Sequence, residues 1–220
     1  MRNLSPYAVT QDGLFGPIVI GWRRKWIVLR EVAQPVADRM VIEHHYSHKA
    51  TSNRFLSMGV FSPVYESREG EMLGVIQLGY GIRPEMKYTF GEDVTGDNAR
   101  EFDRMWLDDR LPKFSETIVL SCLENYLRVA HPEIKYLITY ADGSTGRTGT
   151  IYKAANYKPM GSVKADFYIV PTQGGGRERI HPVTMWHRHK TRAWETMQKI
   201  YPGIRKAEGF QYRFIKELHP

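Results

Sequence analysis

The chain has 220 residues, 42% of them hydrophobic and 25% charged, a composition typical of a globular protein with one sizeable core. Its first residues, MRNLSPYAVT, lack the apolar stretch of a signal peptide, and no run reaches the roughly 20 apolar residues of a membrane span. A single cysteine excludes an internal disulfide and suits a reducing interior, so we expect a cytoplasmic protein.

The net charge of +7 is unevenly distributed along the chain. The segment from Arg177 to Lys216 holds ten Lys and Arg against three Glu, so the rest of the chain is neutral in sum. Such a surplus indicates a surface that faces a polyanion, most simply nucleic acid. A basic face that contacts only solvent would have the same composition, so both interpretations stay open.

The first half of the chain combines predicted strands with one helix. Strands are predicted by β-forming or alternating residues at 22–32, 55–61, 72–80 and 102–108. Pro35 ends the first strand, and residues 37–48 then place apolar and histidine side chains on one helical face. The second and third strands, joined by SPVYESREGE, predict a hairpin.

The second half contains the clearest element, a helix at 115–130 with apolar side chains at helical spacing and Ser115 as its predicted N-cap. Further strands are predicted at 135–140, 163–171 and 210–218, helices at 150–156 and 186–200, and a flexible insertion at 173–179. This order predicts a single α/β (α+β) domain over residues 1–220, with a mixed sheet flanked by helices. Residues 173–209 would form a basic helical insertion before the last strand.

The stretch YADGSTGRTGTIYKAANY, residues 140–157, places a glycine-rich turn between a predicted strand and a predicted helix. It lacks the lysine of a Walker loop, and Thr145 breaks the G-x-G-x-x-G pattern, so both nucleotide-binding fingerprints fail. Asp142, at the end of the strand, is either a functional side chain or a cap of the turn. Tyr152 lies opposite the apolar face of the helix, so it is either exposed or a donor into a cleft.

Three histidines cluster in EHHYSHK, residues 43–49. On a helix, His44 and His48 would point the same way and could share a metal ion such as iron, although no further ligand lies at a motif spacing. His45 could equally be a general base. The sequence also excludes several enzyme classes, because it has no D-P-P-[YF] tetrapeptide of DNA amino-methyltransferases, no G-x-S-x-G elbow and no zinc-deaminase signature.

Four stretches carry a resemblance that covers the chain from about residue 40 to its end: HHYSHK, FDRMWLDDRLPKFSETI, YADGSTGRTGTIYKAANY and GFQYRFIKEL. The element order and TGTIYKAANYKPMG resemble the GNAT acyltransferase fold, and the combination resembles the Mom family of phage DNA-modification proteins. This resemblance implies conversion of adenine in duplex DNA to N6-carbamoylmethyladenine. The modification would act in the host-cell cytoplasm and protect phage DNA from host restriction.

The resemblance also implies catalytic roles for Asp142, Tyr152, Tyr46 and Ser115, and His45, next to Tyr46, is a further catalytic candidate. Asp142 and His45 would position or deprotonate the exocyclic amine of adenine. Tyr152 would protonate or orient the leaving group, and Tyr46 would stack on the base or hydrogen-bond to it. Ser115, at a helix N-terminus, would stabilise the oxyanion of the donor or a phosphate.

Two further groups of residues would bind the donor and the DNA. The donor-binding candidates are Ser115, Glu116, Thr117, Arg147 and Asn156. The DNA-binding candidates are Arg177, Arg179, Arg188, Lys190 and Arg192. Because adenine in a duplex must be flipped out of the stack to be reached, we expect double-stranded DNA to be held through its phosphates and binding to weaken steeply with salt.

The acyl donor is the point at which the chain departs from the GNAT pattern. GNAT proteins hold coenzyme A on a glycine-rich loop before the long helix, whereas this chain reads DRLPKFSET there, without a glycine. A glycyl group on adenine N6 would carry a free amine that can attack C6 through a five-membered ring, and expulsion of the original nitrogen as an amide gives the carbamoylmethyl product. Glycyl-tRNA is therefore the favoured donor.

Three alternatives to this interpretation stay open. An acetyl donor with iron-assisted oxidation could supply the same product. An ordinary acetyl-coenzyme A-dependent acetyltransferase would act on a small amine and would not need the basic end. A non-enzymatic DNA-binding regulator would bind DNA without producing a new nucleoside.

Overall fold

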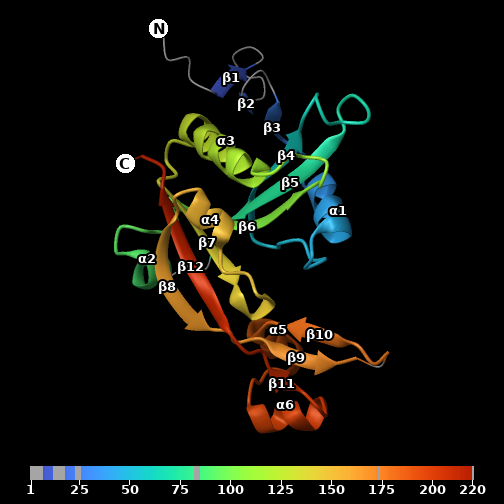
Figure 1. The fold of residues 1–220 in the computed structure, drawn as a ribbon. Coiled ribbons are helices and arrows are strands. Elements are labelled where there is room, and N and C mark those ends of the chain that lie inside the picture. The colour runs from blue at the N-terminus through green and yellow to red at the C-terminus, as the bar shows by residue number, and fades with distance from the viewer. Residues whose placement is uncertain (1–6, 12–17, 23–25, 82–84, 173, 220) are drawn as a thin grey trace. The chain divides into compact units, whose positions relative to one another are not determined.

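The computed structural model describes residues 7–11, 18–22, 26–81, 85–172 and 174–219 (Figure 1). Its helices are α1 (Gln34–His44), α2 (Glu85–Phe90), α3 (Ser115–Ala130), α4 (Thr150–Ala154), α5 (Pro182–His189) and α6 (Trp194–Ile200), with a 3-10 turn at Gly143–Thr145. Its strands are β1 (Tyr7–Gln11), β2 (Ile18–Trp22), β3 (Ile27–Glu31), β4 (Arg54–Phe61), β5 (Met72–Gly79), β6 (Ala99–Leu107), β7 (Tyr136–Asp142), β8 (Lys158–Lys164), β9 (Tyr168–Pro171), β10 (Arg177–Ile180), β11 (Arg205–Lys206) and β12 (Phe210–Glu217).

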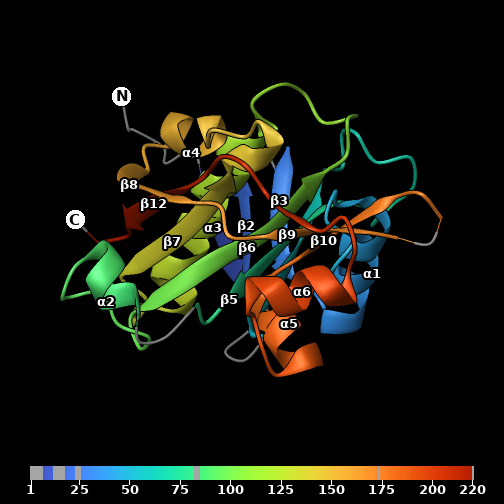
Figure 2. The same ribbon diagram turned by 90° about the horizontal axis from the view of Figure 1, so that it is seen from below.

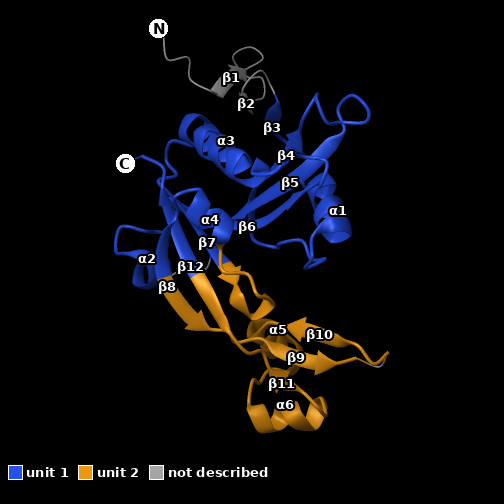
Figure 3. Cartoon of the chain, in the orientation of Figure 1, with its two compact units in different colours: residues 1–140, 150–160, 213–220 blue, residues 141–149, 161–212 orange. Residues whose placement is uncertain are grey.

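The chain forms two compact units (Figure 3). The first unit comprises residues 1–140, 150–160 and 213–220, and the second comprises residues 141–149 and 161–212. That the chain is a single domain with an insertion at 173–209 stays a prediction.

The large sheet has the strand order β1-β2-β3-β4-β5-β6-β7-β12-β8. Strands β1 to β6 pair antiparallel with their sequence neighbours, whereas β6 and β7 pair in parallel. A parallel pair needs a crossover connection, and α3 provides it between these two strands. Mixed pairing with helices on the sheet confirms the predicted α+β architecture.

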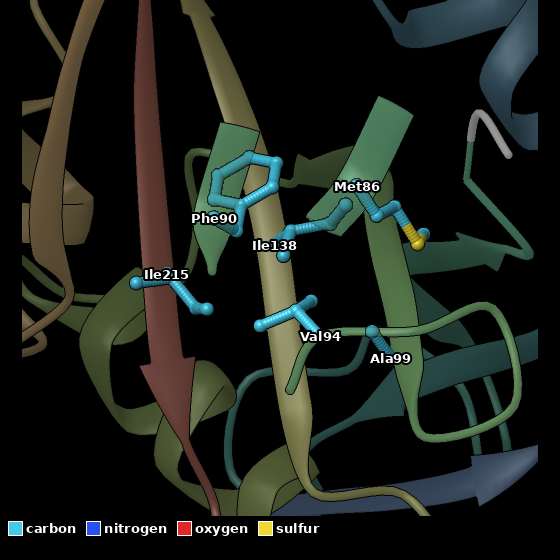
Figure 4. Close-up of a cluster of buried hydrophobic side chains, with 6 residues drawn as sticks. All are labelled: Met86, Phe90, Val94, Ala99, Ile138 and Ile215. Atoms are coloured by element: carbon cyan, nitrogen blue, oxygen red, sulfur yellow. The ribbon is translucent and has the colours of Figure 1, made fainter. Parts of the chain in front are cut away.

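Helices of the first unit cover the sheet through apolar side chains. Helix α1 packs against β4, β5 and β6, while α3 packs against β1, β2 and β3 (Figure 2). Buried residues of α3 recur at helical spacing, including Val119, Leu123 and Leu127, because one face of the helix lies on the sheet. Helix α2 closes a separate cluster formed by Met86, Phe90, Val94, Ala99, Ile138 and Ile215 (Figure 4).

Strand β6 contains the irregularity that positions the candidate site. Its parallel pairing with β7 ends at Phe102 and Thr139, but β6 continues to Leu107 as a partner of β5 alone. Phe102 pairs with Leu78 and Arg104 pairs with Gln77, so Asp103 is an extra residue, a β-bulge. Bulges bend a strand and redirect its side chains, so the bulge redirects side chains at the point where the pairing of β6 with β7 ends.

Gly79 makes room for this bulge. A Cβ atom at position 79 would lie 2.3 Å from Oδ2 of Asp103 and 2.5 Å from the carbonyl oxygen of Asn53. Gly79→Ala should therefore lower the free energy of unfolding by about 1–3 kcal/mol, which denaturant titration would measure. Gly174→Ala is the matched control, because a Cβ at position 174 meets nothing within 4 Å; equal stability of the two variants would contradict the close packing at Asp103.

The second unit has its own three-stranded antiparallel sheet in the order β10-β9-β11. Its core consists of Tyr168, Val170, Ile180, Met185, Met197 and Ile204. Met185 lies on α5 and Met197 on α6, so both short helices pack on this sheet through a single buried methionine each.

Several predicted elements are confirmed, notably the hairpin strands, the helix at 115–130 and the last strand. The predicted strand at 22–32 is wrong as one element, because Trp22 ends β2 and β3 begins at Ile27; residues 23–25 lie outside the described residues. Pro35 lies in the first turn of α1 instead of ending a strand, since proline is tolerated where the helix N–H has no partner. The predicted helix at 37–48 ends at His44.

Three predictions at the basic end are also wrong. The strand predicted at 163–171 is two strands, β8 and β9. The flexible insertion predicted at 173–179 contributes residues 177–179 to strand β10, while residue 173 lies outside the described residues. The helix predicted at 186–200 is the pair α5 and α6, because Lys190 adopts a left-handed conformation with φ of 55° that ends α5.

Candidate active site

Two acidic side chains of β6, Glu101 and Asp103, lie at the point where β6 leaves β7. Their carboxyl groups are hydrogen-bonded to each other, and both side chains are half-buried. Burial raises the pKa of Glu101 to about 8, and the charge of Asp103 and the hydrogen bond add to this effect. Burial raises the pKa of Asp103 to about 6, although Arg104 opposes this shift. Near neutral pH the pair therefore keeps a proton and carries about one negative charge.

The raised pKa of Glu101 has a measurable consequence for stability. The folded protein binds this proton more tightly than the unfolded chain, so the contribution of Glu101 is fully present below about pH 4.5 and is lost as the pH rises through about 8. The melting temperature of the wild-type protein should therefore fall between pH 5 and pH 8, and Glu101→Gln should reduce that fall by about 2–4 °C. Thermal denaturation of Glu69→Gln, an exposed loop variant, is the control; identical pH dependence in all three proteins would contradict the assignment.

Tyr152, on α4, lies among aromatic side chains of the first unit. Its ring centroid is 6.0 Å from that of Phe102, 5.5 Å from that of Phe214 and 5.7 Å from that of Tyr157. Its hydroxyl is hydrogen-bonded to Thr139, whose own hydroxyl donates to the carbonyl of Phe102 at 3.1 Å.

Burial raises the pKa of Tyr152 to about 12. The nearby groups Tyr46 and Glu101 raise it further, while Thr139 and Arg104 act in the opposite direction. Tyr152 is therefore a protonated donor at neutral pH, close to Tyr46 and to the acidic pair. Of the other predicted catalytic residues, Tyr46 thus has an electrostatic effect on Tyr152.

Arg104 of β6 forms a hydrogen bond to the loop after α1, which contains Tyr46. Its Nε donates to the carbonyl of Lys49 at 3.2 Å, and its Nη1 donates to the carbonyl of Asp103 at 2.8 Å. The segment after α1 is thereby held at the bulge. Tyr46 itself is 54% exposed and stacks obliquely on His45, with ring centroids 4.2 Å apart.

His45 is buried, and its Nδ1 accepts the backbone N–H of Ser47 at 3.1 Å and lies 2.8 Å from the Ser47 hydroxyl. A backbone N–H is always a donor, so the neutral ring carries its own proton on Nε2. Nδ1 of His45 is therefore engaged by Ser47 and does not accept a proton in the neutral form, which suits a positioning role better than that of a general base.

Ser115 begins α3 but is not its N-cap, which corrects the sequence prediction. The N-cap is Phe114, in a left-handed conformation with φ of 72°. Ser115 is only 2% exposed, and its hydroxyl donates to the carbonyl of Pro112 at 2.6 Å. Thr117 similarly donates to the carbonyl of Phe114 at 2.9 Å, while Glu116 is half-buried in the same turn. The backbone N–H of Ser115 is also engaged, because it donates to the carbonyl of Pro112 at 3.2 Å. Within the described residues, the N–H groups of Glu116 and Thr117 are the first-turn donors left for an anion.

Asp142 and Arg179 belong to the second unit and form an ion pair there. One carboxylate oxygen of Asp142 binds Arg179, and the other accepts from the backbone N–H of Ser144 at 3.1 Å and from its hydroxyl at 2.6 Å. Burial would raise the pKa of Asp142, but the hydrogen bonds from Arg179 and Ser144 outweigh it and lower the pKa. Asp142 therefore caps the turn at 143–145, one of the two roles that the sequence left open.

The charge of Arg179 is therefore partly neutralised by Asp142 and not fully available to a ligand. Its guanidinium also lies 3.9 Å from the ring centre of Phe167. Arg147, in the same unit, is exposed, and its Nη1 donates to the hydroxyl of Thr145 at 3.1 Å.

The second unit carries an exposed surface of cations and aromatic rings. Four predicted DNA-binding cations are exposed: Arg177, Arg188, Lys190 and Arg192. Arg188 lies 3.7 Å from Glu178, and both side chains remain accessible. Trp186 on α5 is 49% exposed and Trp194 on α6 is 38% exposed. Exposed aromatic rings beside cations provide stacking surfaces and phosphate contacts for nucleic acid.

The sequence profile of the Mom protein family matches residues 26–220. The chain belongs to the Mom protein family. A relative from Escherichia phage Mu, named methylcarbamoylase mom, is 28% identical over 167 residues, which cover 76% of this chain. The match covers 65% of that relative, so it spans less than two thirds of the relative's length.

Solved structures establish the fold of this Mom-family chain. NAA60 of Arabidopsis thaliana, solved in complex with acetyl-CoA, matches it with a TM-score of 0.51 and 8% identity, covering 87% of this chain and 99% of NAA60. The predicted GNAT-like fold is therefore confirmed. Among the described residues, no helix is long and apolar enough to cross a membrane.

The predicted geometry for a shared metal at His44 and His48 is wrong, because the helix ends between them. His44 stacks on Trp106, with centroids 4.2 Å apart, whereas the ring of His48 contacts the carbonyl of Ile42 at 2.9 Å. Within the described ranges, no group of three or more His, Cys, Asp or Glu side chains could hold a metal ion. The described side chains thus offer no suitable set of iron ligands.

Asn156, a predicted donor-binding residue, is exposed and has a left-handed φ of 60°. It lines a hollow of about 480 Å³ in the first unit together with Arg128, Lys158 and Lys216. Its role in binding a donor, like those of the other site residues, stays a prediction.

Sequence reasoning missed Glu101, Asp103, Arg104 and Thr139. The available signal was EFDRMW, in which three charged residues interrupt a strand that is otherwise apolar and aromatic. Charged residues within a strand between buried neighbours need partners, so this pattern indicates a polar site.

Proposed function

We propose that this Mom-family chain modifies adenine in DNA, converting it to N6-carbamoylmethyladenine by transfer of a glycyl group and rearrangement. The observation that carries the proposal is the polar cluster around Tyr152, where the pairing of β6 with β7 ends. The GNAT-like fold and the relative named methylcarbamoylase support it. The product would protect phage DNA against host restriction in the host cytoplasm.

In the first step, N6 of a flipped-out adenine attacks the ester carbonyl of glycyl-tRNA. The N6–acyl bond forms, the bond to the ribose oxygen breaks, and the proton lost by N6 reaches that oxygen through Tyr152, the protonated donor of the site. Tyr46, whose side chain is exposed, binds the base, and His45 positions Tyr46 through the contact between their rings. Asp142 positions the loop 143–149 and does not remove a proton itself.

In the second step, the free amine of the transferred glycyl group attacks C6 and closes a five-membered ring. The original N6 then leaves C6 as the amide nitrogen, so the product has the glycine nitrogen on C6 and the adenine nitrogen in the carboxamide. Every atom of the glycyl adduct is retained. An acetyl group carries no nitrogen and cannot give this product without another nitrogen source and an oxidant.

Glycyl-tRNA is preferred over acetyl-coenzyme A as donor because the loop before α3, DRLPKFSET, has no glycine. The side chains of Ser115 and Thr117 in the first turn are turned back onto backbone carbonyls. These residues do not form the usual cradle for a pyrophosphate, so coenzyme A takes no part in the proposed reaction. Glu116, Arg147 and Asn156 remain proposed contacts for the donor.

The proposed DNA contacts are the exposed cations of the second unit, Arg177, Arg188, Lys190 and Arg192, with Arg179 committed in part to Asp142. The whole proposal is tested by mass spectrometry of nucleosides from DNA of cells that express the protein. N6-carbamoylmethyl-2′-deoxyadenosine is expected; an acetylated small amine without a new nucleoside would support an ordinary acetyltransferase, and unmodified DNA that still binds the protein would support a regulator.

A further inference from the structure

The first unit contains a hollow of about 470 Å³ beside α1, which packs on β5 and β6 (Figure 1). Its lining residues come from α1, from the segment 68–72 that leads into β5, and from the end of β6 with the residues that follow it. This volume is in the range of ligand pockets. Aromatic and apolar side chains lie beside cations in the lining, which suits a ligand with a planar ring and a negative charge.

The aromatic side of the hollow is a stack of two rings, one from β6 and one from α1. Trp106 packs against the buried side chains of Ala37, Val41 and Val75, which hold it in place. His44 stacks on Trp106, with ring centroids 4.2 Å apart and an interplanar angle of 16°. The side chain of His44 is 35% exposed, so a further planar ring can extend the stack. Every nucleobase has a π-face suited to such a position.

The two carboxylates that line the hollow are engaged by one arginine. Arg110 donates from Nε to Asp108 at 2.9 Å, and from Nη2 to Asp108 at 2.8 Å and to Glu71 at 2.9 Å. The hydrogen bonds from Arg110 and from the backbone of Ser67 lower the pKa of Glu71 to about 2, so this group is ionised at neutral pH. The carboxylates and Arg110 thus form a fixed network at one side of the hollow.

Arg39 on α1 and Arg68 before β5 are the other two arginines of the lining. Both side chains are exposed. Among the residues that the structure describes, neither guanidinium group has a hydrogen bond or an ion pair. Three arginines against two carboxylates leave the hollow with one net positive charge, and its uncommitted donors are those of Arg39 and Arg68. Guanidinium groups bind phosphate through paired N–H donors.

We propose that this hollow binds one unpaired nucleotide, with its base stacked on His44 and its phosphate held by Arg39 and Arg68. This site goes beyond the proposed function and does not depend on the identity of the acyl donor. A base inside a duplex has neighbours on both of its faces, so it cannot extend the stack of His44 and Trp106. The hollow is therefore a site for single-stranded nucleic acid, and duplex DNA would not fill it.

Two kinds of strand could supply this nucleotide. The proposed tRNA donor ends in unpaired nucleotides, and an unwound DNA strand exposes its bases as well. Both strands present a base and a phosphate, while RNA adds the 2′-hydroxyl by which proteins distinguish it from DNA. The base and the phosphate are the chemistry that the hollow recognises, so RNA and DNA strands are compared directly in the test.

The first test uses AMP, adenosine and inorganic phosphate as probes of the intact 15N-labelled protein. The indole N–H signal of Trp106, assigned from the spectrum of Trp106→Phe, reports binding at the hollow. AMP should shift this signal at concentrations at least about tenfold lower than adenosine or phosphate, because AMP alone uses both the stack and the arginines. The indole signals of Trp186 and Trp194 report binding to the second unit and should not move at those concentrations.

The double variant Arg39→Gln/Arg68→Gln should weaken AMP binding by at least about tenfold and leave adenosine binding within about twofold of wild type. The matched control is Lys87→Gln/Lys135→Gln, which removes the same charge from exposed positions of the first unit outside the lining. It should change neither affinity. Circular dichroism checks that both variants are folded.

Fluorescein-labelled RNA and DNA strands of four nucleotides then identify the source of the nucleotide by anisotropy. Tighter binding of RNA that the arginine variant loses would assign the site to an RNA strand, and equal losses for both strands would assign it to any unpaired strand. A Trp106 signal that AMP never shifts would overturn the site. Equal affinity of the folded arginine variant and the wild type for AMP would overturn it as well.

Discussion

Tyr152→Phe is expected to lower the rate of adenine modification by about 100-fold or more, because it removes the only proton of the side chain that can reach the leaving oxygen. The ring contacts with Phe102, Tyr157 and Phe214 would remain, so the variant should fold. The hydroxyl of Thr139 already donates to a carbonyl and cannot replace the missing donor. Quantitative mass spectrometry of modified adenosine, with purified protein and DNA, measures the effect.

Tyr88→Phe is the matched control, since Tyr88 is exposed on α2 and its removal should leave the rate within about twofold of wild type. Thermal denaturation of both variants separates loss of chemistry from loss of fold. A Tyr152→Phe protein that is folded and modifies DNA at the wild-type rate would disprove the role of the hydroxyl.

The second large effect concerns DNA affinity. Arg188→Gln, Lys190→Asn and Arg192→Gln together should weaken duplex binding by about 10- to 100-fold and reduce the slope of log K against log salt by about 3, because three phosphate contacts are lost. Asparagine is chosen at position 190 because it tolerates the left-handed backbone that ends α5. Fluorescence anisotropy with a short duplex at several salt concentrations measures both quantities.

Three exposed cations of the first unit provide the control for charge alone. Arg39→Gln, Arg68→Gln and Lys87→Gln change the net charge by the same amount and should leave the salt slope unchanged. Equal losses in both triple variants would mean that DNA responds to total charge and not to the basic face of the second unit.

The spacing of apolar residues was sufficient to predict an element where one face of that element is buried. The apolar spacing of 115–130 predicted α3 with its observed bounds, and the alternating segments around β4 and β5 predicted their hairpin. The resemblance of four stretches to a known family supplied the GNAT-like fold. The prediction of secondary structure failed where an unusual backbone conformation interrupts a helical pattern. Lys190 is the example, because its left-handed conformation, which lysine disfavours, separates α5 from α6.

The site could be predicted only in part, because its polar cluster is assembled by tertiary contacts. Tyr46 and Tyr152 are distant in sequence, and the electrostatic effect of Tyr46 on Tyr152 arises only in the folded chain. The position of Asp103 depends on the bulge and on the space left by Gly79, a residue of the neighbouring strand. Conversely, Asp142 looked like a functional carboxylate at a strand end, and only the positions of Arg179 and Ser144 reveal that both its oxygens are engaged.

In the proposed reaction a glycyl unit, and not an acetyl unit, is built into adenine. The most direct measurement uses purified protein, duplex DNA and [15N]glycyl-tRNA, followed by tandem mass spectrometry of the modified nucleoside. We predict 15N on the nitrogen attached to C6 and none in the carboxamide, because the glycine amine replaces the original N6. Modified adenine without 15N, or with 15N in the carboxamide, would contradict the proposed transfer and rearrangement.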